Sequence, residues 1–151
     1  MEGKIIFLFS ILLLSVVSHS QNFDHKSAYD QLQTNGFPVG LLPENVVGYS
    51  LNTTTGDFVL NLDDHCQITL PPDNYLASYS TKITGKLLDR RIKELNGIRV
   101  RAFFQWWSIT GIKSTEDDLV FEVGIASAKY KSKNFGAIPF CEGRKPRVAS
   151  V

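Results

Sequence analysis

Short apolar runs that alternate with polar residues recur along most of the chain, and this pattern limits its possible folds more than any other feature. Successive residues of a strand face opposite sides of a sheet, so such runs are typical of half-buried strands. Turn residues separate the runs at a regular spacing, with almost no long helical periodicity between them. The pattern predicts an all-β domain, a sandwich or a barrel. The predicted strands span residues 46–51, 58–62, 65–70, 75–83, 98–112, 119–123 and 125–130.

The segments between these strands give the expected turns. A glycine-containing loop over residues 52–57 joins the first two strands into a hairpin. Asn96-Gly97 is predicted to turn the chain just before residue 98. Residues 87–95 fit either a helical turn or a short strand.

One short helix and one domain complete the expected organisation. The helix spans Ser27–Asn35, because Ser27 can cap its start and Gly36 can end it. The chain has 151 residues, of which 43% are hydrophobic and 21% charged, which suits a single globular core. We expect one β domain over residues 21–141 and a mobile polar tail over residues 142–151.

The first twenty residues are predicted to be a secretory signal peptide. Lys4 precedes the apolar run Ile5–Val17, which is shorter than the ~20 residues needed to span a bilayer. Ser18 and Ser20 place small residues where signal peptidase recognises them, so we expect cleavage after Ser20. An uncleaved N-terminal anchor is the alternative. No second apolar run approaches membrane length, so the mature chain is expected to lack a transmembrane segment.

Secretion changes the interpretation of three further residues. Cys66 and Cys141 are the only cysteines, and in an oxidising compartment such a pair usually closes. Free buried thiols, or a catalytic thiol that uses the adjacent His65, are the alternatives. Asn52 begins the only N-x-S/T site and is the expected position of an N-linked glycan.

Charge is balanced in total but unevenly distributed. The 16 Lys and Arg residues against 15 Asp and Glu give a net charge of +1, and this value does not indicate a nucleic-acid-binding protein. Acidic residues dominate from Asn22 to Leu76, and basic residues dominate from Lys82 to Arg101. These stretches form either solvated faces or a basic rim for an anionic partner, such as a lipid head group or an acidic polysaccharide.

The sequence contains no motif that states an activity. The segment Gly124–Ala128 lacks the G-x-S-x-G spacing of a serine-hydrolase elbow. Asp63, Asp64 and His65 are adjacent, and three such neighbours rarely converge on one metal ion. We therefore expect no metal, no cofactor and no nucleic-acid partner, and we assign no catalytic residue.

The most conspicuous aromatic pair is Trp106-Trp107. In a continuous strand Phe104 and Trp106 share one face, while Phe103 and Trp107 share the other. One interpretation is a central strand buried on both faces. The other is an aromatic wall, either of an apolar pocket or of a sugar-stacking platform.

Several short motifs follow one another in a specific order between about Tyr29 and Cys141. They are Gly40-Leu41-Leu42-Pro43, Thr55-Gly56-x-Phe58, Ile83-x-Gly85, Leu95-x-Gly97-Ile98-x-Val100, Phe104-x-Trp106, Phe121-x-Val123-Gly124 and Phe135-x-x-x-Pro139-x-Cys141. This order resembles the plant family called domain of unknown function 538 (DUF538). The resemblance implies a signal peptide, a Cys66–Cys141 disulfide, and two packed antiparallel sheets in a sandwich or flattened barrel. It implies the apoplast or cell wall as the location, with retention along the secretory route as the alternative.

The resemblance implies two functions, binding of lipid or lipopolysaccharide and hydrolysis of a pigment. We expect foremost a non-enzymatic module for an apolar or amphipathic, lipid-like ligand. The residues expected to bind it are Phe104, Trp106 and Phe121 as its lining, and Arg99 and Arg101 near its rim.

Two alternatives are carried with it. One is an esterase acting on a pigment or a cell-wall ester, with Ser127 or Ser108 as nucleophile and His65 as base. The other is a cell-wall interaction protein without a pocket, whose partner is an anionic wall polymer.

Overall fold

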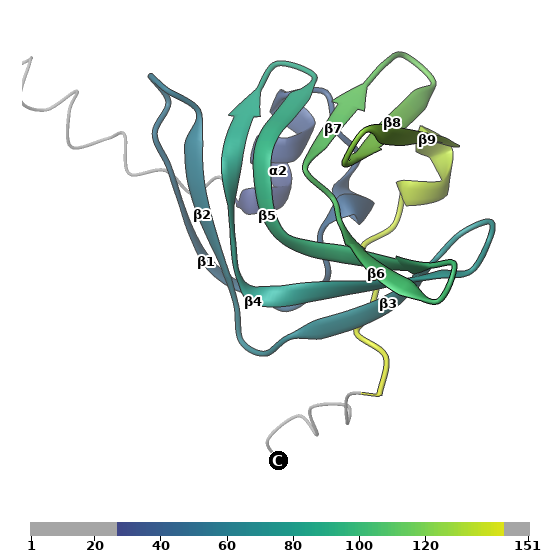
Figure 1. Ribbon diagram of the computed structural model, residues 1–151. Coiled ribbons are helices and arrows are strands. Elements are labelled where there is room, and N and C mark those ends of the chain that lie inside the picture. Colours follow the sequence, from purple (N-terminus) through teal and green to yellow (C-terminus); the bar gives the residue numbers. More distant parts are fainter. Residues whose placement is uncertain (1–26, 144–151) are drawn as a thin grey trace, which may run out of the picture.

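The computed structural model describes residues 27–143 and shows a mostly-β protein with one short helix near its start (Figure 1). This confirms the predicted class. The helical elements are α2 (Ala28–Thr34), η1 (Val39–Leu41) and η2 (Ser132–Phe135). The strands are β1 (Val46–Leu51), β2 (Asp57–Leu62), β3 (Cys66–Leu70), β4 (Tyr75–Leu88), β5 (Arg91–Ala102), β6 (Gln105–Ser108), β7 (Gly111–Ser114), β8 (Asp118–Val123) and β9 (Ala126–Lys131).

The predicted signal peptide, and the predicted tail after Gly143, lie outside the described residues. Between residues 27 and 143, no helix is both long enough and apolar enough to cross a membrane.

All nine strands belong to one antiparallel sheet that bends on itself without closing. The main order is β1-β2-β4-β5-β7-β8-β9, and β3 and β6 are added beside β4 and β5. The first part of β4 pairs with β3, and its later part pairs with β2. The first part of β5 likewise pairs with β7, and its end pairs with β6. Figure 1 shows β4 and β5 turning sharply together, so the two sheets that the resemblance implied are two parts of one bent sheet.

The bend in β5 lies at Gly97. Its φ of +112° is in the region that favours glycine, and a Cβ there would lie 2.7 Å from the Lys82 carbonyl oxygen of β4. The strand runs through Asn96-Gly97, so the turn predicted at this pair is wrong. The hairpin turn instead lies at Asp89-Arg90, between the paired residues Leu88 and Arg91. Residues 87–95 are therefore the end of β4, this turn and the start of β5.

The helix caps one end of the bent sheet. Ser27 forms the predicted cap, since its hydroxyl accepts from the Asp30 amide and the Asp30 carboxylate accepts from the Ser27 amide. Leu32 is buried with the apolar residues of β2, β4, β5 and β7. At Gly40 in η1 a Cβ would lie 2.3 Å from the Phe135 carbonyl oxygen. Only glycine at this position lets η1 approach η2 so closely.

A second hairpin turn interrupts the long strand predicted over residues 98–112. Ala102 pairs with Gln105, and the two residues between them, Phe103 and Phe104, have φ of 51° and 65°. Positive φ at both central positions defines a turn that Asn-Gly usually fills, and it is rare for bulky residues. The sequence has no glycine, asparagine, aspartate or proline at this turn, so the pattern predicted a continuous strand, and that prediction is wrong. β6 is a short strand paired with β5, so the interpretation of Trp106-Trp107 as a doubly buried central strand is also wrong.

The predicted disulfide between Cys66 and Cys141 is confirmed. It fixes the C-terminal segment to the start of β3, and both residues are buried. The contact continues one residue further, because the Glu142 amide donates to the Gln67 carbonyl at 2.8 Å. The Glu142 carboxylate also accepts from the Thr69 amide at 3.0 Å.

Removing the disulfide should destabilise the fold strongly. The two cysteines are 75 residues apart. A disulfide that closes a loop of that size lowers the conformational entropy of the unfolded chain, which stabilises the folded state by about 4 kcal/mol. We expect the Cys66→Ala/Cys141→Ala variant to lose stability of that order in equilibrium urea unfolding at pH 7. A loss below about 1 kcal/mol would show that the bridge adds little to the fold.

Among the described side chains with a raised pKa, Tyr79 is the most deeply buried. Its hydroxyl donates to the Leu41 carbonyl at 2.8 Å, and burial raises the pKa of Tyr79 above the usual value of about 10. The folded state therefore holds this tyrosine neutral at pH values where the unfolded state ionises it. Its contribution to stability is complete below pH 10 and is lost as the pH rises above 10.

Tyr79→Phe should cost about 1 kcal/mol at pH 7, because the Leu41 carbonyl loses its partner. The variant should also remove a loss of about 1.4 kcal/mol that the wild type suffers at pH 11. The measurement is urea unfolding of both proteins at pH 7 and pH 11. A stability difference that stays constant between the two pH values would contradict this account.

Candidate ligand-binding hollow

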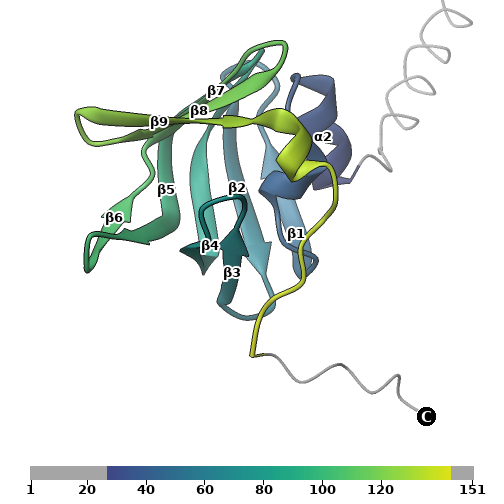
Figure 2. The ribbon, with the colours of Figure 1, turned by 90° about the vertical axis from the view of Figure 1, so that its right-hand side faces the viewer.

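An apolar hollow with a volume of about 390 Å³ opens between three hairpins. Figure 2 shows the β5–β6 and β8–β9 hairpins projecting on the side opposite α2, with the β3–β4 hairpin between them and the helix. Residues from all three hairpins line the hollow. They are Leu70, Tyr75, Val100, Ala102, Phe103, Trp107, Ile109, Phe121, Val123, Ala126, Ser127, Ala128 and Tyr130.

Strand alternation decides which side chains of the β5–β6 hairpin face the hollow. Val100 pairs with Trp107, and both line it. Their neighbours alternate to the outer face, where Arg101 pairs with Trp106. The indole nitrogen of Trp107 donates to the Ala102 carbonyl at 3.0 Å, which fixes the ring across its own hairpin. Trp107 is 40% exposed and so remains open to a ligand.

The opposite wall comes from β8 and β9 and combines the rings of Phe121 and Tyr130 with small residues. Phe121 is buried and packs against Tyr130 and Phe135, at ring-centre distances of 5.9 and 5.7 Å. Ala128 lies directly across from Phe121 in the β8–β9 pair. Because alanine fills little of this position, the space in front of the Phe121 ring stays open.

The polar groups of the hollow are hydroxyls. Burial raises the pKa of Tyr130, with smaller contributions from the nearby Tyr75 and the negative charge of Asp73. Tyr130 therefore stays neutral at physiological pH and can both donate and accept a hydrogen bond. None of the thirteen lining residues is charged. The hollow suits an apolar body with one or a few hydrogen-bonding groups.

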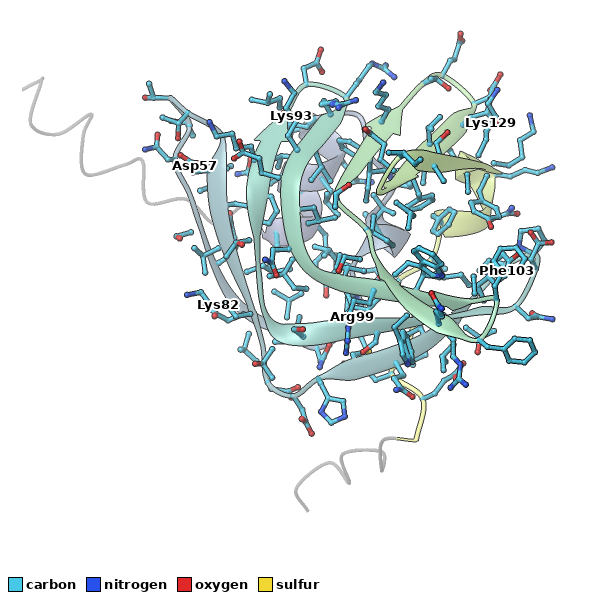
Figure 3. All side chains as sticks on the ribbon, in the orientation of Figure 1. Asp57, Lys82, Lys93, Arg99, Phe103 and Lys129 are labelled. Atoms are coloured by element: carbon cyan, nitrogen blue, oxygen red, sulfur yellow. A yellow bond between two sulfur atoms is a disulfide. The ribbon has the colours of Figure 1, made fainter. Side chains whose placement is uncertain are left out.

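The structure brings one of the five predicted ligand-binding residues to this site. Phe121 lines the hollow, while Phe104 is 94% exposed at the hairpin tip. Trp106 is on the outer face with Arg99 stacked over its ring at 5.6 Å, and Arg101 is on the same face. Figure 3 shows Phe103 at the end of the hairpin and Arg99 further back along it.

Sequence reasoning expected Trp106 in the site, where Trp107 lies, because of a single turn. The two-residue loop at Phe103-Phe104 reverses the strand, so Trp107 and not Trp106 continues the face of Val100 and Ala102. The Tyr75 and Tyr130 hydroxyls come from strands 55 residues apart in sequence, and nothing in the sequence pairs them.

The residues of the esterase alternative are dispersed. Ser127 lines the hollow, whereas Ser108 is on the outer face of β6. His65 precedes β3, is 71% exposed and contacts the Asp64 carboxylate at 3.1 Å. Among the described residues, neither serine hydrogen-bonds to a histidine, and no three side chains group as metal ligands.

Asn52, the expected glycosylation site, is exposed, and its side-chain oxygen accepts hydrogen bonds from the Thr54 and Thr55 amides. Glycosylation of Asn52 stays a prediction.

The fold and the hollow define a β protein built on one bent sheet, with an open apolar site between its hairpin tips. The family model described as "Protein of unknown function, DUF538" matches residues 28–136. The chain therefore belongs to the DUF538 family, as its motif order suggested. No curated protein and no solved structure matches it.

Proposed function

We propose that this protein is a non-enzymatic binding module that holds an apolar or amphipathic, lipid-like molecule in the hollow. The observation that carries the proposal is the hollow itself, which is open, uncharged and lined by aromatic, aliphatic and small side chains. Its volume of about 390 Å³ falls in the range of small-molecule sites, roughly 300–1,000 Å³.

The arrangement of the lining favours an elongated amphipathic ligand. An acyl or similar chain would lie between the Trp107 ring and the wall formed by β8 and β9, replacing the water in the hollow. A polar group would reach the hydroxyls of Tyr75 and Tyr130. A charged head group would stay at the open mouth, because no lining side chain could compensate a buried charge.

Secretion to the apoplast or cell wall remains a prediction from the N-terminal sequence, and it would place the site in contact with extracellular lipids. The esterase alternative gains one supporting residue, Ser127, but the described residues offer it no base.

The two tryptophans provide a matched pair of reporters for ligand entry. Trp106→Phe leaves Trp107, inside the hollow, as the only indole, and Trp107→Phe leaves Trp106 on the outer face. We expect monomeric lysophosphatidylcholine to shift the fluorescence of the Trp106→Phe variant to shorter wavelength, because the acyl chain covers Trp107. The emission of the Trp107→Phe variant should not change.

A shift of equal size in both variants would indicate adsorption to the outer surface and contradict the proposal. The absence of a shift in the Trp106→Phe variant, at lipid concentrations up to micelle formation, would also contradict it.

Filling the hollow should block it. Ala128→Phe places a second ring opposite Phe121, so we expect at least a tenfold loss of lysophosphatidylcholine affinity in the same titration. The control is Ser108→Phe, an equal enlargement of an exposed outer-face position on β6. Both variants should melt cooperatively near the wild-type temperature. Unchanged affinity in a folded Ala128→Phe variant would show that the ligand binds elsewhere.

A further inference from the structure

The hairpin tips around the hollow expose large apolar side chains to solvent. Phe103 is 85% exposed and Phe104 94% exposed at the β5–β6 tip. Ile125 is fully exposed at the β8–β9 tip, the two-residue loop between Val123 and Ala126. Single exposed apolar residues are ordinary, but several around one opening indicate a contact surface.

The choice of residues at these tips costs stability and so requires another explanation. Phe103 and Phe104 occupy two successive positive-φ positions, where Asn-Gly would be free of strain. Their rings gain little from the core, since both are almost fully exposed. Small polar residues at these two positions would therefore make the fold more stable.

The order of side chains along the β5–β6 hairpin matches that of a segment lying in a membrane interface. The two phenylalanines form the tip, and Trp106 and Trp107 follow one pair further back. On the outer face Arg101 lies level with Trp106, and Arg99 lies two residues further from the tip. Apolar rings favour the acyl region, tryptophans the head-group level, and arginines the phosphates above it. Neither arginine has an ion-pair partner among the described residues, and Arg99 instead stacks on Trp106.

The second tip also suits contact with a membrane. The loop and its flanks from Val123 to Ala128 contain no charged residue. Figure 2 shows both hairpins projecting on the same side of the molecule. Asp73 lies near Tyr130 on the β3–β4 hairpin. Because its negative charge would be repelled by anionic lipid, the contact is expected to exclude that hairpin.

We propose that the β5–β6 and β8–β9 tips insert into the surface of a lipid bilayer that contains anionic lipid. Phe103, Phe104 and Ile125 enter the membrane, and Arg99 and Arg101 bind lipid phosphates. The mouth of the hollow then opens toward the membrane. Only one part of the inference rests on the proposed function: that lipid passes directly between the membrane and the hollow.

The test is flotation of the full secreted chain with vesicles of phosphatidylcholine and phosphatidylglycerol. The tip variant is Phe104→Gly/Ile125→Ser, and neither residue lines the hollow. Glycine at position 104 relieves the strain of the positive φ there. In the β8–β9 turn the positive φ of 64° belongs to Gly124, which the variant keeps. The control is Phe140→Ser, which removes an aromatic ring that is 79% exposed outside the two tips.

We expect the wild type and the Phe140→Ser control to float equally, and the tip variant to bind at least tenfold less while melting at or above the wild-type temperature. Arg99→Gln/Arg101→Gln should weaken binding to vesicles with phosphatidylglycerol more than to phosphatidylcholine alone. Equal flotation of the tip variant and the wild type would overturn the inference. So would failure of the wild type to float, or a wild-type dimer that the tip variant dissociates.

Lysophosphatidylcholine titration of the tip variant separates this inference from the proposed function. A variant that no longer floats but still binds the lipid supports both proposals. A wild type that binds the lipid without floating overturns the docking alone, and one that floats without binding the lipid overturns the hollow alone.

Discussion

Two long antiparallel strands, β4 and β5, carry the whole architecture because each belongs to both parts of the sheet. Their shared bend requires a residue without a side chain where β5 lies close against β4, and Gly97 meets this need, because a Cβ there would lie 2.7 Å from the Lys82 carbonyl oxygen. Without the bend the sheet would be open and nearly flat, with no enclosed core. The capping helix, the buried Tyr79 and the hollow all depend on the concave face that it creates.

The bend also separates the molecule into a closed end and an open end. At the closed end α2, η1 and η2 seal the concave face, and the Cys66–Cys141 bridge fixes the C-terminal segment beside β3. At the open end no helix among the described residues covers the sheet, and the hairpins extend beyond the core (Figure 2). Apolar side chains that would be buried at the closed end are there left facing a cavity. The same curvature that stabilises one end therefore leaves a binding site at the other.

The sequence predicted the parts of the fold that local signals determine. The strand alternation predicted most strands to within a few residues, Ser27 and Gly36 delimited the helix, and the cysteine pair predicted the disulfide. It failed where tertiary context overrides local preference. Asn96-Gly97 has turn chemistry but supplies a bend, and Phe103-Phe104 lacks turn chemistry but forms a turn. The second error shifted the strand phase by one residue, which exchanged Trp106 for Trp107 in the expected site. Phe121 lines the hollow, and no unexpected turn separates it from its own strand pattern, while its part in binding a ligand stays a prediction.

The most direct test of the central claim is native mass spectrometry of the chain, secreted by a plant host and purified without detergent, followed by organic extraction. The account predicts a stoichiometric adduct on the disulfide-closed chain that extracts as a lipid-like molecule, and its absence from the Ala128→Phe variant. A wild-type mass that corresponds to the bare or glycosylated chain alone, in preparations that also fail to take up added lysophosphatidylcholine, would contradict it.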